Sequence, residues 1–218
     1  MELLPKPCAS NPRLMAVIGI TGGISTGKST LCACLREIVP SAKFFDADHA
    51  AHQLVDFDPE VKEEIRREFG SAIFSADQEL NREKLRRIVF NDAAKRRALE
   101  QILHPRIRRQ WSAEAETRRN SPDFFFADIP LLYETGGERL CDRVVVVACS
   151  SKTQVRWLME RMLVERSAAE QMINSQMPLD EKIRRADHVV WNNGFRTVLA
   201  DQARCLVALW QKKSWTTT

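Results

Sequence analysis

The spacing of apolar residues changes several times along this chain, and the first change indicates a strand followed by a helix. Residues 15–20 are apolar apart from one glycine, a run that suits a buried strand. Apolar residues then recur at positions 31, 34, 35 and 38, which is the spacing of one helix face. Pro40 is expected to end this helix, because its ring disfavours helical geometry at the residue before it.

Further segments are predicted to be strands of the same sheet. They cover residues 41–45, 124–130, 143–148 and 187–191. The segment 143–148 is apolar after its first residue, as expected of a parallel strand that is covered on both faces. Because these strands are interspersed with helical segments, the pattern predicts an α/β fold with a doubly wound parallel sheet flanked by helices.

Residues 50–117 follow a helical period, and no strand is predicted among them. One helix is expected to start at Pro59 and a second near Asn81. A third is expected to end before Pro105, because proline is tolerated only in the first turn of a new helix. His104, at this expected break, fits a surface histidine and a ligand group equally well.

Two capping boxes predict a pair of helices in the C-terminal half of the chain. The first box begins at Ser151 and predicts a helix to about residue 164, and the second begins at Ser167 and predicts a helix to about residue 176. Three arginines gather on this pair of helices: Arg156, Arg161 and Arg166. Such a cluster favours a lid that closes over a phosphate, and the alternative is a pair of exposed helices with surface ion pairs.

The stretch between the first strand and the first helix carries a phosphate-loop motif. Residues 22–29 fit G-x-x-x-x-G-K-[ST] in the required strand–loop–helix context, and an ordinary turn with a helix cap is the alternative. Glycines let backbone N–H groups turn toward phosphate oxygens, and the N-terminus of the next helix adds donors. Lys28 is expected to reach the β- and γ-phosphates of a nucleotide, and the Ser29 hydroxyl to hold Mg²⁺.

Aspartates follow two of the predicted strands. Asp46 and Asp48 come directly after the segment 41–45, and in an extended backbone their carboxylates point to one side. They are expected on the rim where open α/β sheets bind ligands, and the alternative is a solvated strand end with two capping aspartates. Asp128 follows a buried strand and has the position from which aspartates contact Mg²⁺ in phosphate-loop enzymes.

Composition and charge narrow the class of protein. Hydrophobic residues make up 44% and charged residues 28% of the chain, as in soluble globular proteins, and no apolar run reaches the ~20 residues of a membrane span. Residues 82–119 include twelve basic and five acidic side chains, which suggests a polyanionic ligand or simply a charged helix surface. The six cysteines lack metal-ligand spacing and no secretory signal is apparent, so we expect a reduced, cytoplasmic protein.

Taken in order, these motifs resemble those of the dephospho-coenzyme A kinase family. The resemblance extends from Met15 to Trp210 and rests on the segments 18–24, 27–30, 46–48, 51–54, 103–105, 129–134 and 186–187, with Arg161, Gln176, Lys182 and Asn192. Similar sequences usually carry glycine where Ser25 stands. If this position needs a positive φ, the serine is strained.

The resemblance implies a kinase that phosphorylates the ribose 3′-hydroxyl of dephospho-CoA in the last step of CoA synthesis, with ATP and Mg²⁺. It implies one domain, residues 14–218, after an N-terminal extension, residues 1–13, that we expect to be disordered. Within the domain we expect three parts: a core of residues 14–50, 120–155 and 185–212, an inserted helical CoA-binding lobe at about 51–119, and a helical lid at about 156–184.

The resemblance also implies roles for individual residues. Asp48 is expected to be the general base, with Lys28 and Arg161 as the other catalytic residues. The expected ATP-binding residues are Gly23, Ile24, Ser25, Thr26, Gly27, Lys28, Ser29, Thr30 and Asn192. The expected acceptor-binding residues are Asp46, His52, Leu103, His104, Pro105, Pro130, Leu131 and Leu132. Mg²⁺ is expected at Ser29 and Asp128, and neither a nucleic acid nor a membrane is expected as a partner.

Three other functions remain open at the level of sequence. A nucleoside or nucleotide kinase would share the loop, the lid and the base, and would differ in its acceptor lobe. A regulatory GTPase should carry an N-K-x-D motif, which does not occur in the chain. A nucleic-acid-binding protein would explain the basic helices and leave the phosphate loop and the carboxylates without a role.

Overall fold

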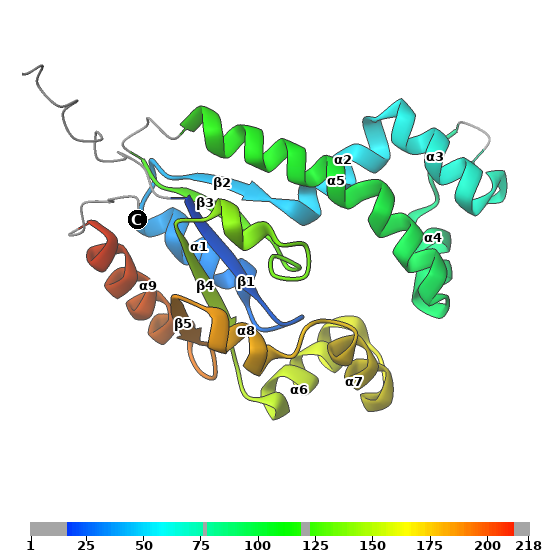
Figure 1. Ribbon diagram of the computed structural model, residues 1–218. Helices are drawn as coiled ribbons and strands as arrows, with labels where there is room; N and C mark the ends of the chain where they lie inside the picture. Colours follow the sequence, from blue (N-terminus) through cyan, green and yellow to red (C-terminus); the bar gives the residue numbers. More distant parts are fainter. Residues whose placement is uncertain (1–16, 76–77, 119–122, 212–218) are drawn as a thin grey trace, which may run out of the picture.

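A computed structural model describes residues 17–75, 78–118 and 123–211 (Figure 1). Its centre is a five-stranded parallel sheet with the strand order β2-β3-β1-β4-β5. The strands are β1 (Val17–Gly22), β2 (Lys43–Asp46), β3 (Phe125–Asp128), β4 (Arg143–Ala148) and β5 (His188–Trp191). The predicted parallel α/β sheet is therefore confirmed, and the predicted extension 1–13 lies outside the described residues.

The order of the strands places a topological switch point at β1. This strand lies in the middle of the sheet, with β3 on one side and β4 on the other. Ligands of open α/β sheets bind at such a point, beyond the carboxyl ends of the strands. The loop that follows β1 leads into α1 (Lys28–Ile38), so the phosphate-loop motif lies at the switch point.

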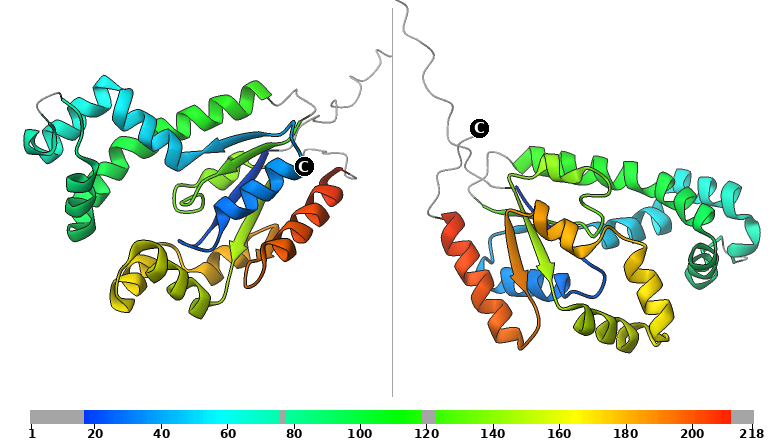
Figure 2. Two further views of the ribbon diagram at one scale, coloured as in Figure 1. Left: turned by 180° about the vertical axis from the view of Figure 1, so that it is seen from behind. Right: turned by 60° about the horizontal axis from the view of Figure 1, so that its bottom comes forward.

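Alternate side chains of the central strands enter two separate hydrophobic cores, because strand side chains alternate with period two. In β4, Val145 and Val147 pack in the core under α1 and α9 (Arg196–Gln211), together with Trp210. Each of these three side chains is almost fully buried. The two helices therefore cover the same face of the sheet (Figure 2).

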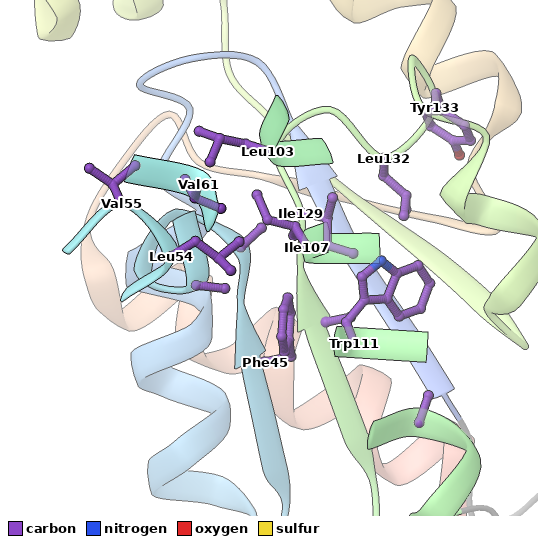
Figure 3. Packing of buried hydrophobic residues seen from close by; sticks show 14 of the residues in the cluster. Phe45, Leu54, Val55, Val61, Leu103, Ile107, Trp111, Ile129, Leu132 and Tyr133 are labelled. Atoms are coloured by element: carbon purple, nitrogen blue, oxygen red, sulfur yellow. The ribbon is translucent and has the colours of Figure 1, made fainter. Parts of the chain in front are cut away.

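The second core lies on the opposite face of the sheet and extends into the neighbouring helices. One stripe of α5 (Ala93–Arg118), made of Leu103, Ile107 and Trp111, packs with Ile129 and Leu132 of the chain after β3 (Figure 3). The same core continues through α2 (Ala47–Phe57) into α3 (Pro59–Phe69), as the labelled side chains in Figure 3 show. The helices after β2 are thus joined to the sheet by continuous apolar packing.

Four helices and a short 3₁₀ helix occupy the segment that was predicted to be helical. After α2 and α3 come η1 (Ser71–Ile73) and α4 (Arg82–Asn91), and then α5. Figure 1 shows α3 and α4 far from the sheet, on the same side as its carboxyl ends. Asp58 caps α3 ahead of Pro59, and Asn81 caps α4 by accepting a bond from Lys84 N at 2.9 Å, so both predicted helix starts are confirmed.

The predicted break at Pro105 is wrong, because α5 continues through this proline to Arg118. A proline inside a helix removes one backbone hydrogen bond and crowds the preceding turn, and tertiary contacts offset that cost here. Leu103 and Ile107 are buried on either side of Pro105, and the Arg106 guanidinium bonds both Glu64 and the Ile102 carbonyl. Packing against the lobe and the sheet therefore overrides the local signal.

The predicted extended geometry of Asp46 and Asp48 is also wrong. β2 ends at Asp46, which caps α2 by accepting a hydrogen bond from His49 N at 2.9 Å. Asp48 lies in the first turn of α2. A short oxygen side chain at the end of a strand satisfies the free amides of a helix start, which favours the helix over a longer strand.

The two helices predicted from the capping boxes exist, but their capping residues lie shortly before the predicted Ser151 and Ser167. α6 (Ser151–Met162) is capped by Ser150, whose hydroxyl accepts from Thr153 N at 3.2 Å. α7 (Arg166–Asn174) begins after Glu165 without a side-chain cap. A short helix α8 (Leu179–Arg185) then leads to β5. None of the helices in the described part of the chain is both long and apolar enough to cross a membrane.

Candidate functional site

The phosphate loop is held in shape by a glycine that no other residue can replace without strain. Gly27 has φ +97°, and a Cβ at this position would overlap the side chain of Asn192. Asn192 Nδ2 in turn donates to Thr26 O at 3.0 Å, so the close approach of the two residues fixes the end of the loop. Asn192, predicted to bind ATP, therefore lies behind the loop and contacts its backbone.

Two glutamines of the segment that carries α6 and α7 hold the opposite end of the loop at Ile24. Gln154 of α6 donates from Nε2 to Ile24 O at 2.9 Å, and Ile24 N donates to Gln176 Oε1 at 3.0 Å. Within the loop, the buried Thr26 hydroxyl donates to Gly23 O at 2.9 Å. Both polar groups of the Ile24 backbone are thus hydrogen-bonded to glutamine side chains of the segment that carries α6 and α7, so this segment is joined directly to the loop.

Ser25 has φ +59°, in the left-handed region. The strain that was predicted for a non-glycine residue at this position is therefore present. The side chain lines the cavity above the loop, and its Oγ is buried without a hydrogen-bond partner in the described part of the protein. An unpaired buried hydroxyl facing a phosphate loop is a free donor for a ligand oxygen.

A cavity of about 500 Å³ opens above the loop, and we call it the phosphate cavity. Its lining includes most of the residues that sequence predicted for nucleotide, metal and catalysis, namely Ile24, Ser25, Gly27, Lys28, Ser29, Thr30, Asp48, Asp128 and Arg161, together with Asp46 and Pro130, which were predicted to bind the acceptor. Gly23 and Thr26 are buried beneath it. Trp157 and Gln176 complete the lining. The structure therefore brings the predicted side chains together at the switch point of the sheet.

Lys28 and Asp128 have opposite charges inside this cavity. Lys28 Nζ donates to Gly23 O at 3.1 Å, and burial lowers the pKa of its ammonium while the charge of Asp128 acts in the opposite direction. Burial raises the pKa of Asp128 from its usual 3.8 to about 6, although the Lys28 charge opposes that rise. Both groups therefore lie in a poorly solvated site, where charged groups interact more strongly with one another than in water.

Asp128 also has the features of a metal ligand. Its Oδ1 is buried without a partner among the described residues, and Cys32 Sγ lies 3.5 Å from its Oδ2. The register of the sheet places Asp128 opposite Asp46 and beside the end of β1. The described residues hold no cluster of three or more His, Cys, Asp and Glu arranged for a metal. Mg²⁺ needs only one or two carboxylates with phosphate oxygens and water, so Asp128 and the Ser29 hydroxyl fit this ion.

A second cavity, of about 170 Å³, adjoins the phosphate cavity, and we call it the apolar cavity. Its walls come from α2, from one stripe of α5 and from the turn after β3, and include Leu103, His104, Ile107, Trp111 and Leu131. Asp48 and Pro130 line both cavities. A ligand in the apolar cavity can therefore place a polar group against Asp48 and face a phosphate above the loop.

Not every residue predicted for the acceptor lines this cavity. Leu103, His104, Pro130 and Leu131 line it, whereas His52 and Pro105 are exposed and do not contribute to the walls. Leu132 is fully buried in the hydrophobic core. Trp111 was not predicted, although it follows Leu103 and Ile107 at helical spacing on α5, which would have placed it on the same face.

A third cavity, of about 270 Å³, lies between the lobe and the lid, and we call it the arginine cavity. It is lined by Arg86, Phe90 and Arg96 of α4 and α5, by residues of α7, and by Ile24 and Gln176, which it shares with the phosphate cavity. Several basic residues of this segment pair with carboxylates, as Arg82 does with Asp56 and Arg106 with Glu64. Arg86 and Arg96 have no carboxylate partner in the described ranges.

The three lid arginines have different surroundings. Arg156 lies 4.0 Å from Glu160, and Arg166 lies 2.8 Å from Glu170, so these two make surface ion pairs along their helices. Arg161 lines the phosphate cavity. Arg156 and Arg166 therefore fit the alternative of surface ion pairs, and a lid role for Arg161 stays a prediction. One face of α6 carries Gln154, Trp157 and Arg161 at helical spacing. Gln154 and Trp157 were not predicted, although their spacing from Arg161 would have identified them.

The chain is similar to known proteins over most of its length. A family model described as dephospho-CoA kinase matches residues 16–197. A dephospho-CoA kinase of Symbiobacterium thermophilum is 44% identical over 181 residues, 83% of this chain and 75% of that protein. One from Listeria monocytogenes is 40% identical over 178 residues, 81% of this chain and 88% of that protein.

Solved structures share the fold. A Thermus thermophilus crystal structure superposes with a TM-score of 0.72 at 33% identity, covering 91% of this chain and 98% of that one. A dephospho-CoA kinase from Campylobacter jejuni superposes with a TM-score of 0.63 at 23% identity, over 90% of this chain and 97% of its own. At that lower identity the likeness concerns the fold alone.

Proposed function

The chain belongs to the dephospho-CoA kinase family, and from this premise we propose that Asp48 is the base of an ATP-dependent transfer to the ribose 3′-hydroxyl of dephospho-CoA. One observation carries the proposal: Asp48 lines both the phosphate cavity and the apolar cavity. A carboxylate at the junction of a donor site and an acceptor site is placed to orient the attacking hydroxyl and to accept its proton.

Several side chains support a role of the phosphate cavity in binding ATP. Lys28 and Arg161 both line it and supply positive charge where the transferred phosphoryl group develops negative charge. Ser29 and Asp128 are the residues we assign to Mg²⁺, which when bound neutralises charge on the β- and γ-phosphates. The Ile24 backbone, held by Gln154 and Gln176, ties lid closure to the loop that cradles the phosphates.

The acceptor is proposed to span the other two cavities. Its adenine suits the apolar cavity, where Trp111 and Leu131 offer flat and apolar contacts. Its diphosphate suits the arginine cavity, because Arg86 and Arg96 have no carboxylate partner within the described residues and guanidinium groups bind phosphate oxygens as a fork. The ribose then lies between the two, beside Asp48.

The experiment is a comparison of acceptors. ADP release from Mg·ATP is measured with dephospho-CoA and with a panel of nucleosides and nucleoside monophosphates. Dephospho-CoA should exceed every other acceptor in kcat/KM by at least about a hundredfold, since both the adenine and the diphosphate contribute contacts. Comparable turnover of adenosine or AMP would identify a nucleoside or nucleotide kinase instead. The cytoplasmic location and the lack of a nucleic-acid partner remain predictions.

A further inference from the structure

Lys182 of α8 has a fully buried side chain although it carries a charge. Its Nζ donates to Pro130 O at 2.9 Å and to Gly22 O at 3.3 Å, and it forms an ion pair with Glu134 Oε1 at 2.9 Å. Burial lowers the pKa of this ammonium, and the hydrogen bond and charge of Glu134 act in the opposite direction. Three partners thus compensate a group that is otherwise costly to bury.

The partners of Lys182 belong to different walls of the site. Gly22 is the last residue of β1, directly before the phosphate loop. Pro130 follows β3 and lines both the phosphate cavity and the apolar cavity, and its carbonyl also accepts a bond from the Thr21 hydroxyl at 3.0 Å. A single ammonium therefore bridges the start of the loop and the wall that the two cavities share.

Glu134 extends the same connection to the lid. Its Oε1 accepts a hydrogen bond from Met177 N at 3.0 Å as well as the ion pair from Lys182. Met177 follows Gln176, whose side chain holds the Ile24 backbone of the loop. The chain that returns from the lid is thus fixed at two adjacent residues, one bonded to the loop and one to the Lys182–Glu134 pair.

We propose that Lys182 is a positioning residue, which sets the distance between the phosphate loop and Pro130 and so aligns the acceptor with the transferred phosphate. The inference rests on the proposed assignment of the two cavities to ATP and acceptor. An apolar side chain of similar length would fill the same space at no cost in desolvation. The two carbonyl oxygens that Lys182 holds near one another would then repel, and Pro130 would move relative to the loop.

The test separates alignment from stability with a double variant. Lys182→Met alone leaves the Glu134 carboxylate without its buried partner, whereas Lys182→Met with Glu134→Gln removes both charges, keeps an oxygen that accepts from Met177 N, and should melt close to wild type. The double variant should still show a kcat for dephospho-CoA at least tenfold below wild type. The Kd of ATP, measured by calorimetry without acceptor, should stay within threefold, because the loop amides and Lys28 are unchanged. A double variant that melts normally and turns over within threefold of wild type overturns the proposal.

Arg185→Met is the matched control on the same helix. Arg185 pairs with Glu138 at 2.9 Å and lies over the Tyr133 ring, but it does not bond Gly22 or Pro130. Arg185→Met should lower the melting temperature without changing kcat by more than about twofold. A loss of kcat equal to that of the double variant would mean that any disturbance of α8 has this effect, which also overturns the proposal.

Thr21→Val is the variant to measure if the Lys182 variants do not fold. It removes the other donor to Pro130 O while preserving the shape of the side chain, so kcat should fall at least threefold. An unchanged kcat contradicts the role of this carbonyl. Failure of the proposed function is visible separately, because the wild-type protein would then show no turnover of dephospho-CoA at all.

Discussion

Asp46 and Asp48 lie on opposite sides of the junction between β2 and α2 and have different tasks at it. Asp46 Oδ1 is bonded to His49 N at 2.9 Å as the helix cap. Asp48 is the second residue of the helix, and its carboxylate makes no hydrogen bond or ion pair with the described residues. Both line the phosphate cavity, but Asp48 alone of the two also lines the apolar cavity.

Asp48→Asn is therefore expected to lower kcat by roughly 10²–10⁴-fold, the usual range for loss of a general base. The KM values for both substrates should change little, because only a transition-state interaction has been removed. Asp46→Asn should keep near-normal kcat and stability, since asparagine caps helices as well as aspartate does. Steady-state kinetics of the two single variants decide the assignment, and the reverse outcome would make Asp46 the base.

Asp128→Asn is expected to stabilise the ligand-free protein and to inactivate it. Burial raises the pKa of Asp128 to about 6, so the folded state binds the proton of this carboxyl more tightly than the unfolded state. The contribution of Asp128 to the free energy of unfolding therefore falls as the pH rises from about 4 to about 6. Removing the charge should add about 3 kcal/mol of unfolding free energy at pH 8 and only about 1 kcal/mol near pH 4.5.

Urea unfolding of wild type and Asp128→Asn without Mg²⁺, at both pH values, measures this difference. Asp142→Asn would be a poor control because Asp142 bonds Val17 N, whereas Asp201, on the exposed surface of α9, provides a suitable one. Asp201→Asn should change stability little at either pH. Equal stability of wild type and Asp128→Asn at pH 8 would show that the buried carboxylate is not destabilising.

Replacement of Ser25 tests whether its unpaired hydroxyl contacts the nucleotide. Ser25→Ala keeps the left-handed backbone and removes the donor, whereas Ser25→Gly removes both the donor and the strain. The hydroxyl would add one hydrogen bond to those that the loop amides and Lys28 make to the phosphates, so both variants should raise the KM for ATP by about tenfold or less. Lys28→Ala should raise the KM for ATP much more. A Ser25 variant as impaired as Lys28→Ala would show that the hydroxyl is essential.

Arg86 and Arg96 are expected to act on the acceptor and not on ATP. Replacing both with alanine should raise the KM for dephospho-CoA at least about tenfold, since a charge-assisted hydrogen bond is worth about 1.5–3 kcal/mol, and leave the KM for ATP within about twofold. Arg87→Ala is the matched control, because Arg87 lies on the same helix, is exposed and pairs with Glu83. A rise in the KM for ATP instead would place the ATP phosphates in the arginine cavity.

The features that were predicted correctly from the sequence depend on residues that are neighbours in the chain. The glycines and the lysine of the phosphate loop are adjacent in the chain, and the strand before them is continuously apolar, so the motif and its place in the sheet are confirmed. The start of α4 at Asn81 likewise depends on one side chain and the amides next to it.

Sequence failed where contacts between distant residues decide the outcome. The cost of Pro105 is offset by apolar side chains of other elements, which no local pattern reveals. Lys182 belongs to the residues that carry the family resemblance, but its burial was not predicted, because it depends on carbonyls 52 and 160 residues away. The arginine cavity exists only because α4 and α7 lie beside each other. From the sequence alone, Arg86 and Arg96 could therefore not be distinguished from the other basic residues of the lobe.

Each of the first two cavities contains an indole ring, Trp157 in the phosphate cavity and Trp111 in the apolar cavity. Indole emission responds to the polarity and the quenching groups around the ring, so the protein carries an intrinsic optical reporter at each site. Comparing the wild-type signal with those of Trp157→Phe and Trp111→Phe assigns each change in emission to one cavity. Stopped-flow fluorescence can then follow which substrate binds first, without any label attached to the protein or the ligands.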